Sequence, residues 1–393
     1  MQYSNRKVLL LLEASREYGR GLLRGILGYN SLHEPWFIEW QEPFYLQTNT
    51  SSRKRLKGLV QDVDGIIMRE QQDNDLFFDL GVPVIFASYL DKYLPGTYRI
   101  TTNDKSIGVC VAKHFQERGF VNFGYFGYDD MYWSENRKNK FVQELEKDGY
   151  TCHTFHQFKR QSERLWNNEQ HRAAEWIASL PKPVGVFCCN DERARQARDA
   201  CRLAQLHVPG EVAIVGADND EFICNTSLPS LSSVSLNLEA AGYQSAELLD
   251  GLMNGDKDLP KQIVVEPSRV AVRQSSDIYA ISDAVVSEAI HFIHNNHHRP
   301  IQVSDLADHI AISRRTLHDR FKRVVGCTAY SYIKKARVDR IKELLVETDW
   351  TITRIAENMG FTSSDHIATY FRSQVGINPY KYRLKYRSKN TVD

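Results

Sequence analysis

Short apolar runs alternate with amphipathic stretches over the first half of the chain. The apolar runs predict strands at 8–12, 37–40, 65–68, 82–87, 123–128, 152–156, 184–188 and 212–216. The stretches between them predict helices at 20–29, 53–60, 75–80, 106–118, 136–147, 171–180 and 191–206. Fully apolar strands separated by helices are typical of parallel sheets covered on both faces. Because the pattern restarts after Thr101, we predict an α/β fold of two Rossmann-like lobes, with a ligand cleft outside the carboxyl ends of the strands.

From residue 285 onward only helical spacing is present, and one pattern occurs twice. In its first copy, Ser304 is a natural N-cap for a short helix and Ser313 for a second one. Ala307 is small at a position where two helices must cross closely, as in a helix-turn-helix. The residues expected to face inward are Leu306, Ala307, Ile310, Leu317, Phe321 and Val324.

The second copy spans 352–375, with Gly360-Phe361 as its turn and Ser363, Ser364 or both as N-caps of its second helix. A long amphipathic helix at 328–346 joins the two copies, and Asn378-Pro379 is expected to end the helical pattern. The inward-facing residues of the second copy are predicted to be Ile355, Ala356, Met359, Ile367, Tyr370 and Phe371. The second half is therefore predicted to be an all-α domain with two helix-turn-helix units.

Charge divides the chain at the same place. The net charge of the 393 residues is only +1, but residues 283–393 hold 18 Lys and Arg against 12 Asp and Glu. The remaining residues hold 32 against 37. A basic C-terminal half suits nucleic acid, although a solvated charged face has the same composition. We expect a sensor domain at 1–275, a linker at 276–284 and a DNA-binding domain at 285–393. The start of the linker overlaps the polar segment 274–277.

Several classes of protein are disfavoured by the sequence. No stretch approaches the ~20 apolar residues of a membrane span, and the N-terminal apolar run is too short for a signal peptide. The seven cysteines form no C-x-x-C pair, so we expect reduced thiols in the cytoplasm and no metal site. Gly19, Gly21 and Gly25 follow the first strand, but their spacing is one residue too long for a dinucleotide fingerprint. With no P-loop and no G-x-S-x-G elbow, we expect neither a cofactor nor catalysis.

The first half resembles the sugar-binding core of the LacI/GalR repressors and of periplasmic sugar-binding proteins. The resemblance covers residues 7–273. It rests on segment 212–219 (VAIVGADN) followed by 231–234 (LSSV), on segment 186–191 (VFCCND), and on the helix 242–249. It implies a two-lobed sensor of the periplasmic-binding-protein type, with a sugar in the cleft.

The second half resembles the AraC/XylS family. The matching motifs are Ser313-x3-Leu317-x3-Phe321-Lys322-x3-Gly326, Ile355-Ala356-x3-Gly360-Phe361, and Phe371-Arg372-x3-Gly376-x2-Pro379-x2-Tyr382-Arg383. Asp319, His366 and Thr369 depart from that family's usual residues. Asp319 either accepts a hydrogen bond from cytosine N4 or pairs with a neighbouring arginine. The combination of both halves resembles the XylR-type regulators of xylose operons.

Four residues are candidates for ligand binding. Tyr18 follows the first strand, where the sugar-binding family places an aromatic ring, and Arg137 matches that family's hydroxyl-binding arginine. Asp218 closes an apolar strand, where a carboxylate has little structural reason to lie. Asp191 either binds ligand or caps a helix. Asn103-Asp104 inverts the family's usual Asp-Asn order, which leaves the role of this pair open.

Polar residues that face outward on the second helix of each helix-turn-helix unit are candidates for DNA binding. They are Arg314, Arg315, His318, Ser363, Ser364 and Thr369. Arginine binds guanine through two hydrogen bonds, while serine and threonine are less selective. Each of these side chains alternatively contacts a phosphate or stays exposed.

The resemblance implies a cytoplasmic, homodimeric activator that binds operator DNA, responds to a sugar (D-xylose above others) and works with RNA polymerase. Another sugar or a purine is the alternative effector. A DNA-modifying or sugar-converting enzyme on this scaffold is the alternative class, but the zinc-spaced cysteines or clustered carboxylates such enzymes need are missing from the sequence.

Overall fold

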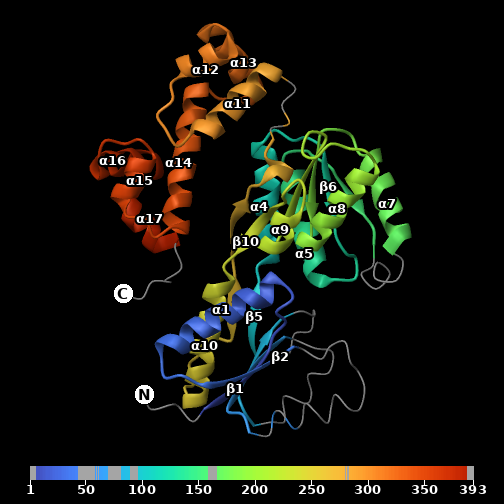
Figure 1. Ribbon diagram of the computed structural model, residues 1–393, viewed down its shortest axis with the longest axis vertical. Coiled ribbons are helices and arrows are strands. Elements are labelled where there is room, and N and C mark those ends of the chain that lie inside the picture. Colours follow the sequence, from blue (N-terminus) through green and yellow to red (C-terminus); the bar gives the residue numbers. More distant parts are fainter. Residues whose placement is uncertain are drawn as a thin grey trace. The chain divides into compact units, whose positions relative to one another are not determined.

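The computed structural model describes residues 6–42, 58, 60, 62–69, 81–88, 96–157, 166–278, 280 and 283–386. The helices expected at 53–60 and 75–80 lie outside the described residues, apart from positions 58 and 60. The chain forms two compact units: residues 1–116 with 121–277, and residues 117–120 with 278–393. The first unit is an α/β domain with two sheets, and the second is helical (Figure 1). The predicted fold class is confirmed.

The first sheet of the α/β unit has the strand order β11-β5-β4-β3-β1-β2, with every neighbouring pair parallel. Helices α1 (Glu17–Leu32) and α10 (Leu238–Asn254) lie side by side against one face of it (Figure 1). The strands are β1 (Lys7–Leu11), β2 (Phe37–Gln41), β3 (Gly65–Arg69), β4 (Val84–Ala87), β5 (Tyr98–Thr102) and β11 (Gln262–Val265).

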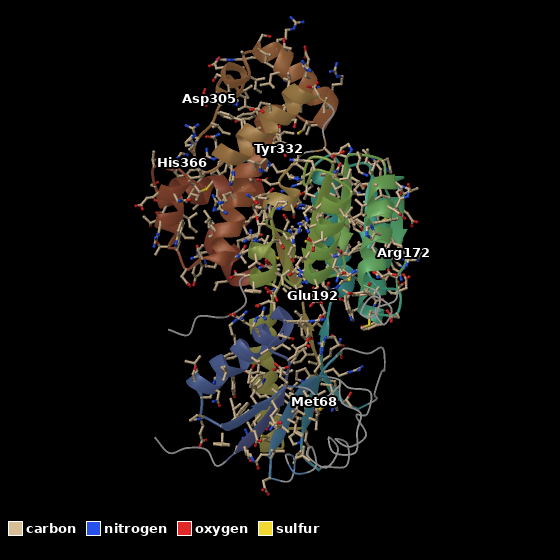
Figure 2. The ribbon with its side chains drawn as sticks, turned by 45° about the vertical axis from the view of Figure 1, so that its right-hand side comes forward. Met68, Arg172, Glu192, Asp305, Tyr332 and His366 are labelled. Carbon is tan, nitrogen blue, oxygen red and sulfur yellow. The ribbon has the colours of Figure 1, made fainter. Side chains whose placement is uncertain are left out.

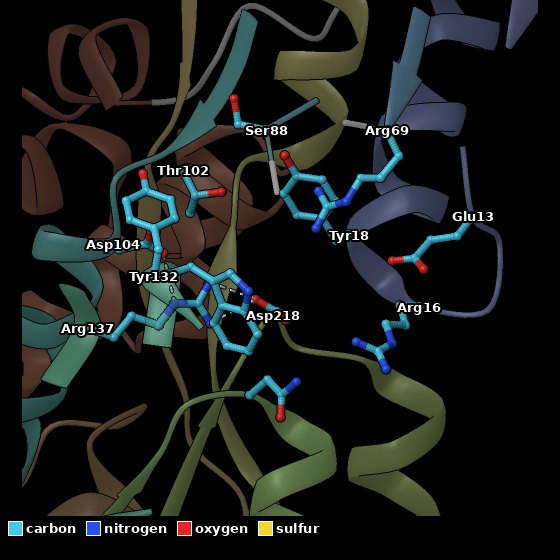
Figure 3. Close-up of a pocket in the computed structure, with 12 residues that line it drawn as sticks. Glu13, Arg16, Tyr18, Arg69, Ser88, Thr102, Asp104, Tyr132, Arg137 and Asp218 are labelled. Atoms are coloured by element: carbon cyan, nitrogen blue, oxygen red, sulfur yellow. Dashed lines mark hydrogen bonds and ion pairs between the residues drawn. The ribbon is translucent and has the colours of Figure 1, made fainter. Parts of the chain in front are cut away.

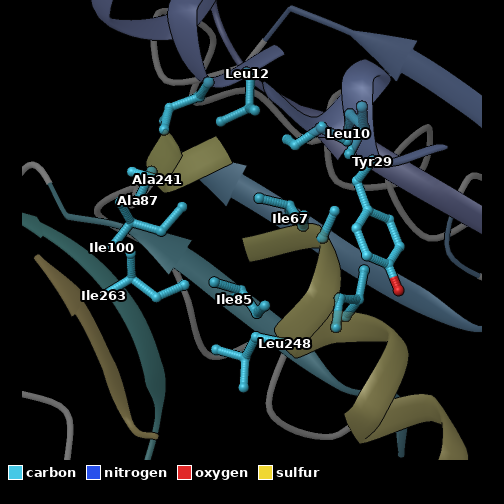
Figure 4. Packing of buried hydrophobic residues seen from close by; sticks show 14 of the residues in the cluster. Leu10, Leu12, Tyr29, Ile67, Ile85, Ala87, Ile100, Ala241, Leu248 and Ile263 are labelled. Carbon is cyan, nitrogen blue, oxygen red and sulfur yellow. The ribbon is translucent and has the colours of Figure 1, made fainter. Parts of the chain in front are cut away.

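The core of this first lobe lies between the sheet and those two helices. Successive side chains of a strand point to opposite faces, so Leu10, Ile67 and Ile85 face the helices while their neighbours face the other side. Ala241 and Leu248 of α10 belong to the same buried cluster as these strand residues (Figure 4). On the opposite face the buried strand residues form a separate cluster, which consists of Leu9, Leu11, Val63, Ile66, Met68 and Phe86.

Glycines allow α1 and α10 to approach each other closely. A Cβ atom at Gly25 would lie 2.0 Å from the carbonyl oxygen of Glu239, and one at Gly242 would lie 2.2 Å from that of Leu22. A Cβ at Gly19 would lie 1.7 Å from the carbonyl oxygen of Glu13. The glycines after the first strand are therefore accounted for by backbone packing.

The second sheet has the order β12-β10-β9-β8-β6-β7, with β12 antiparallel to β10 and the other pairs parallel. Its strands are β6 (Phe123–Phe126), β7 (Cys152–Phe155), β8 (Val184–Cys188), β9 (Val212–Ala217), β10 (Ser232–Leu236) and β12 (Pro267–Ala271). Its helices are α4 (Asp104–Glu117), α5 (Tyr132–Glu146), α7 (Trp166–Ser179), α8 (Asp191–Leu203) and α9 (Glu221–Thr226).

Alternation along β6 shows how helices cover both faces of this second sheet. Phe123 and Tyr125 point toward α5, where the Phe123 and Phe141 rings are 6.4 Å apart between centroids. Phe126 points the other way and stacks on Trp176 of α7 at 5.8 Å. The chain crosses between the lobes after β5, after β10 and between β11 and β12. Because of these crossings, residues far apart in sequence meet where the lobes face each other.

The helical unit contains two hydrophobic clusters that share one long helix, α14 (Ala329–Glu347). Ala329 and Ile333 belong to the cluster of the first helix-turn-helix, and Ile341 and Leu345 to that of the second. His366 is exposed near the start of α16 (Figure 2). The other helices are α11 (Ala284–Asn296), α12 (Val303–Ile310), α13 (Arg314–Val325), α15 (Ile352–Asn358), α16 (Ser364–Val375) and α17 (Pro379–Tyr386).

Two expectations about the first helix-turn-helix were wrong in detail. Helix α12 begins at Val303 with Gln302 as N-cap residue, so Ser304 is already helical. The reason is a bond from the Gln302 backbone N–H to Asp305 Oδ2 at 2.8 Å, which fixes the start earlier. Val324 is 36% exposed instead of inward, because the neighbouring Val325 packs against the core in the last turn of α13.

Asn378-Pro379 starts a helix instead of ending the pattern. Proline suits the first turn of α17 since its missing N–H is not needed there, and Asn378 Oδ1 accepts the Lys381 backbone N–H at 2.7 Å. Arg383 then donates to the carbonyl oxygens of Leu345 at 2.9 Å and Trp350 at 2.7 Å. Part of the basic tail is thus fixed to the end of α14.

The polar segment 274–277, expected as linker, is largely folded into the α/β unit. Gln274–Ser276 form a 3-10 turn in which Ser275 and Ser276 are fully buried. The Ser275 hydroxyl donates to the Ile214 carbonyl oxygen at 2.7 Å and accepts the Ser232 N–H at 2.9 Å. The Ser275 side chain therefore bridges the backbones of the neighbouring strands β9 and β10.

Candidate functional site

A pocket lies where the carboxyl ends of the strands of both lobes face each other (Figure 3). It encloses about 560 Å³, part of which opens to solvent. From the first lobe it is lined by Glu13, Arg16, Tyr18, Arg69, Ser88 and Thr102, and from the second by Asp104, Tyr132, Trp133, Arg137, Asn190 and Asp218. Three of the four candidate ligand-binding residues, Tyr18, Arg137 and Asp218, therefore share one pocket.

Arg137 is the central cation of this pocket and is only 4% exposed. Its Nε donates to Asp104 Oδ1 at 2.9 Å, and Nη1 donates to the Cys189 carbonyl oxygen at 2.5 Å. Both Nη1 and Nη2 lie 3.3 Å from Asp218 Oδ1. Burial lowers the pKa of Arg137, but the carboxylates of Asp218 and Asp104 outweigh it and hold that pKa above its ordinary value. The guanidinium is therefore permanently charged, and its bonds to Asp104 and to the Cys189 carbonyl oxygen fix its orientation.

Asp218 takes a backbone conformation that is rare for a residue with a side chain. Its φ is +96°, directly after β9, and its backbone N–H donates to the Val234 carbonyl oxygen at 3.1 Å. Such strain persists only where the surroundings impose it, and it concentrates at functional sites. Here it turns a carboxylate that is 24% exposed toward Arg137 and the pocket.

Aromatic rings and buried polar atoms make up much of the remaining wall. The Arg69 guanidinium lies 4.4 Å from the Tyr18 ring centroid, and that of Arg137 lies 5.2 Å from the Trp133 ring (Figure 3 shows the Tyr18 contact). Within the described chain, Ser88 Oγ and Trp133 Nε1 are buried without a hydrogen-bond partner in the protein, and the Tyr18 hydroxyl lies near Thr102 and Arg69. Buried polar atoms in native proteins are normally satisfied, so these atoms of the pocket have bonding capacity for water or a polar ligand.

Asp191, the fourth candidate, lies at the start of α8 and outside the lining of the pocket. The N-cap of α8 is Asn190, whose Oδ1 accepts the Arg193 backbone N–H at 2.9 Å. Asp191 Oδ2 instead accepts the Asp220 backbone N–H at 2.6 Å, and burial raises its pKa well above the usual range. Asp220 Oδ2 in turn accepts a hydrogen bond from Arg20 Nη2 at 2.6 Å. Asp191 thus supports a loop that ties α1 of the first lobe to the second lobe.

The helical unit presents two helices with the features of recognition helices. Ser313 Oγ accepts the Thr316 N–H at the start of α13, and Ser363 Oγ accepts the His366 N–H at the start of α16, each at 3.1 Å. The predicted caps are therefore present, with Ser363 as the one used. Among the candidates, Arg314, Arg315, His318, Ser363 and Thr369 are exposed and Ser364 is half-buried.

Comparison with known proteins identifies the family. A periplasmic binding protein-like domain matches residues 112–276 and a helix-turn-helix domain matches 306–385. The xylose operon regulatory protein of Haemophilus influenzae is 30% identical over 383 residues, which cover 96% of this chain and 98% of that protein. Its counterpart in Escherichia coli K12 is 27% identical over 384 residues, or 96% of each. The chain belongs to the family of xylose operon regulatory proteins.

Solved structures agree with this family assignment. A structure of the xylose-binding transcription activator xylR is 27% identical, with a TM-score of 0.62 over 98% of this chain and 100% of that one. A periplasmic binding protein/LacI regulator from Alkaliphilus metalliredigens, in complex with D-xylulofuranose, shares the sensor fold at 21% identity and a TM-score of 0.57, and covers 70% of this chain and 99% of its own. As a member of this family, the protein is a sugar-sensing transcription regulator with a DNA-binding helix-turn-helix domain. No helix among the described residues is long and apolar enough to cross a membrane.

Sequence reasoning left several pocket residues unassigned. Asp104 of the Asn103-Asp104 pair contacts Arg137, while Asn103 Oδ1 accepts the Ser106 N–H and so caps α4. The inverted order therefore places the carboxylate at the first helical position, where it reaches the pocket. Arg69 and Ser88 follow apolar strands as Asp218 does, so position after a strand was a signal available for them. Nothing in the sequence indicates Trp133.

Proposed function

We propose that D-xylose is the effector of this regulator, that it binds in the pocket between the two lobes, and that its binding activates transcription of xylose catabolism genes. The observation that carries the proposal is the constellation of Arg137, Asp218 and Tyr18 at one pocket in a chain of the xylose operon regulatory family. The protein binds its sugar without converting it, and it works in the cytoplasm, where its operator is.

The chemistry of the pocket suits a sugar. Sugar hydroxyls both donate and accept hydrogen bonds, so a site needs donors beside acceptors. Arg137 supplies N–H groups and Asp218 supplies carboxylate oxygens, while the Tyr18 hydroxyl and Ser88 Oγ are buried polar atoms with bonding capacity left. The Trp133 ring offers a flat apolar surface to the C–H side of a sugar, with its Nε1 as a further donor.

A ligand at this place is able to control the arrangement of the lobes. Its contacts come from both lobes, so it favours whichever arrangement brings them together, by the difference between its affinities for the two states. The Arg16–Glu192 ion pair at 3.0 Å and the Arg20–Asp220 ion pair at 2.6 Å join the same two lobes beside the pocket. We propose that this change alters the pairing of two protomers, which sets the spacing of four helix-turn-helix units on the operator and their access to RNA polymerase.

Calorimetry with the full-length protein tests the proposal. We expect binding heat with D-xylose and weaker or no heat with L-arabinose, D-ribose, D-glucose and guanine. Asp218→Ala should weaken xylose binding by roughly 10- to 150-fold for each charge-assisted bond lost, at ~1.5–3 kcal/mol per bond. Asp256→Ala removes an exposed carboxylate that does not line the pocket, so it should bind xylose like the wild type.

Each outcome decides a different part of the proposal. Unchanged xylose affinity in Asp218→Ala would remove Asp218 from the site. If another sugar or guanine gave binding heat and xylose gave none, the pocket would stand as the ligand site but the effector would not be xylose. Conversion of xylose to another compound, detected by chromatography of the bound sugar, would contradict the proposal that the protein binds its sugar without converting it.

A further inference from the structure

One carboxylate lies at the centre of the outward face of the first recognition helix. Asp319 is two positions from both Leu317 and Phe321, which are fully buried in the core below α13. At 3.6 residues per turn this spacing places Asp319 on the opposite, exposed face of the helix. Arg315 and Lys322, four positions before and three after, are exposed on the same side. A negative charge therefore stands between two positive charges on a helix of a DNA-binding unit.

Two arginines that follow this carboxylate along the helix, Arg320 and Arg323, are bound elsewhere. Arg323 stands four positions after Asp319, the usual spacing for an ion pair within a helix, but its Nη2 lies 3.5 Å from Asp283. Arg320 binds Asp283 through two hydrogen bonds of 2.8 Å each. Among the described residues, the side chain of Asp319 has neither an ion pair nor a hydrogen bond.

Asp283 is well suited to retain both arginines. It lies directly before α11 and its Oδ1 accepts the backbone N–H groups of Val285 and Val286, so the helix start holds it in place. The hydrogen bond from Arg320 holds the pKa of Asp283 below its ordinary value, so this carboxylate keeps its charge to lower pH. Both arginines therefore have an anionic partner other than Asp319.

An unpaired carboxylate on this face is costly unless it has a specific partner. The phosphates of DNA repel it, and it lowers the affinity for DNA in general. In the major groove, guanine presents only acceptors, and thymine presents an acceptor and a methyl group. Adenine presents its N6 donor beside the N7 acceptor, a pair that suits an amide side chain, whereas cytosine presents the N4 donor that acidic side chains accept from. We propose that Asp319 reads a cytosine amino group and so determines the sequence specificity of the first helix-turn-helix. This inference rests on the proposed function only in that α13 must enter the major groove.

Selection of bound duplexes from a library with 30 random base pairs tests the inference with the full-length protein, with and without D-xylose. The wild type should enrich sites with cytosine at one position, and replacing that base pair should weaken binding roughly 5- to 150-fold. Asp319→Ala should lose the preference at that position alone and bind random DNA more tightly. Asp319→Arg should change it to guanine, which arginine recognises.

Asp308→Ala is the matched control. It removes an exposed carboxylate from α12 of the same helix-turn-helix, so it changes the charge equally without touching the recognition helix. It should raise affinity for random DNA and leave the selected sequence unchanged. The thermal midpoint of Asp319→Ala should not fall below that of the wild type, because the side chain has no folded-state partner and alanine has the higher helix propensity.

A selected sequence that is identical for wild type, Asp319→Ala and Asp319→Arg would overturn the role of Asp319 while leaving the regulator intact. Loss of preference at every position in Asp319→Ala would also overturn it, since that result means general misplacement of the helix. A wild type that enriches no sequence under either condition would instead contradict the proposed function, and this inference with it.

Discussion

Arg137 and Asp104 form an ion pair that is almost completely removed from solvent. Their Nε and Oδ1 atoms are 2.9 Å apart, and the two side chains are 5% and 4% exposed. The same guanidinium also faces Asp218 at 3.3 Å, so two carboxylates that line the pocket share one cation. Binding and stability therefore depend on the same residue, and variants at this place must be chosen to separate the two effects.

Removal of Arg137 should destabilise the protein strongly. Arg137→Ala leaves the buried Asp104 carboxylate without its cation, and breaking a buried pair in this way costs about 3–5 kcal/mol. The double variant with Asp104→Asn should recover a large part of that loss, because no uncompensated charge then remains. Denaturant unfolding monitored by circular dichroism measures both. Equal stability of the single and double variants would show that Asp104 is not the group left unsatisfied.

The close approach of α1 and α10 predicts opposite effects for two glycine substitutions. Gly242→Ala places a Cβ 2.2 Å from the Leu22 carbonyl oxygen and forces the helices apart, which should cost ~1–3 kcal/mol. Gly28→Ala, on the same helix as Leu22, meets nothing within 4 Å and should stabilise by ~0.5–1 kcal/mol through helix propensity. Thermal unfolding of both variants decides it, and a neutral Gly242→Ala would contradict the packing described above.

The Asp283–Arg320 pair predicts a pH-dependent part of the stability. The pKa of Asp283 is lowered in the folded state, mainly by the hydrogen bond from Arg320, so its contribution is full above the unfolded pKa of ~3.9. It is lost as pH falls through the lower folded pKa. Asp283→Asn should therefore unfold at lower denaturant concentration than the wild type at pH 7 and at pH 5, with the difference shrinking below about pH 4.

A second variant at the same position separates the ion pair from the helix cap. Asn retains a side-chain oxygen for the N–H groups of Val285 and Val286, whereas Asp283→Ala removes it and should cost a further ~0.5–2 kcal/mol at every pH. The wild type is expected to be more stable to denaturant than Asp283→Asn at pH 7. If this difference in stability were unchanged at pH 3, titration of the Asp283 carboxylate would be ruled out as its source.

The length of α14 predicts the layout of the operator. Its 19 residues span about 28 Å and share the cores of both helix-turn-helix units, so the two recognition helices are held at a fixed separation. Entry into successive major-groove faces needs roughly 34 Å, or one turn of DNA. Footprinting should reveal two tandem half-sites per protomer. Inserting five base pairs between them should abolish protection of one half-site, whereas changing the spacer sequence at constant length should not.

Much of the architecture could be predicted from the sequence because it depends on neighbours along the chain. Apolar runs predicted the strands β1, β3, β8 and β9 within one or two residues, and Ser313 and Ser363 predicted the starts of both recognition helices. Tyr18 and Arg137 were candidates for the cleft through the family resemblance, and Asp218 through its place at the end of a strand. Strand β11 and helix α11, by contrast, were not predicted. Strand β11 has only four residues and acquires its structure from its neighbour in the sheet. Helix α11 carries Val286, Ala289, Ile290 and Ile293 at helical spacing, so its sequence signal was available and was missed.

Local patterns in the sequence account for which segments are strands and helices and for which end of each sheet carries polar groups, since periodicity and capping act over a few residues. The pairing of charges, in contrast, depends on how the chain folds in three dimensions. Arg137 selects Asp104 and Asp218, which are 33 and 81 residues away, and Arg320 selects Asp283 at a distance of 37 residues. The same holds for Asp191, which lies outside the pocket lining, and for Asp319, which has no ion-pair partner among the described residues. An ion pair forms wherever folding brings two groups within a few ångströms, and no local pattern encodes that distance.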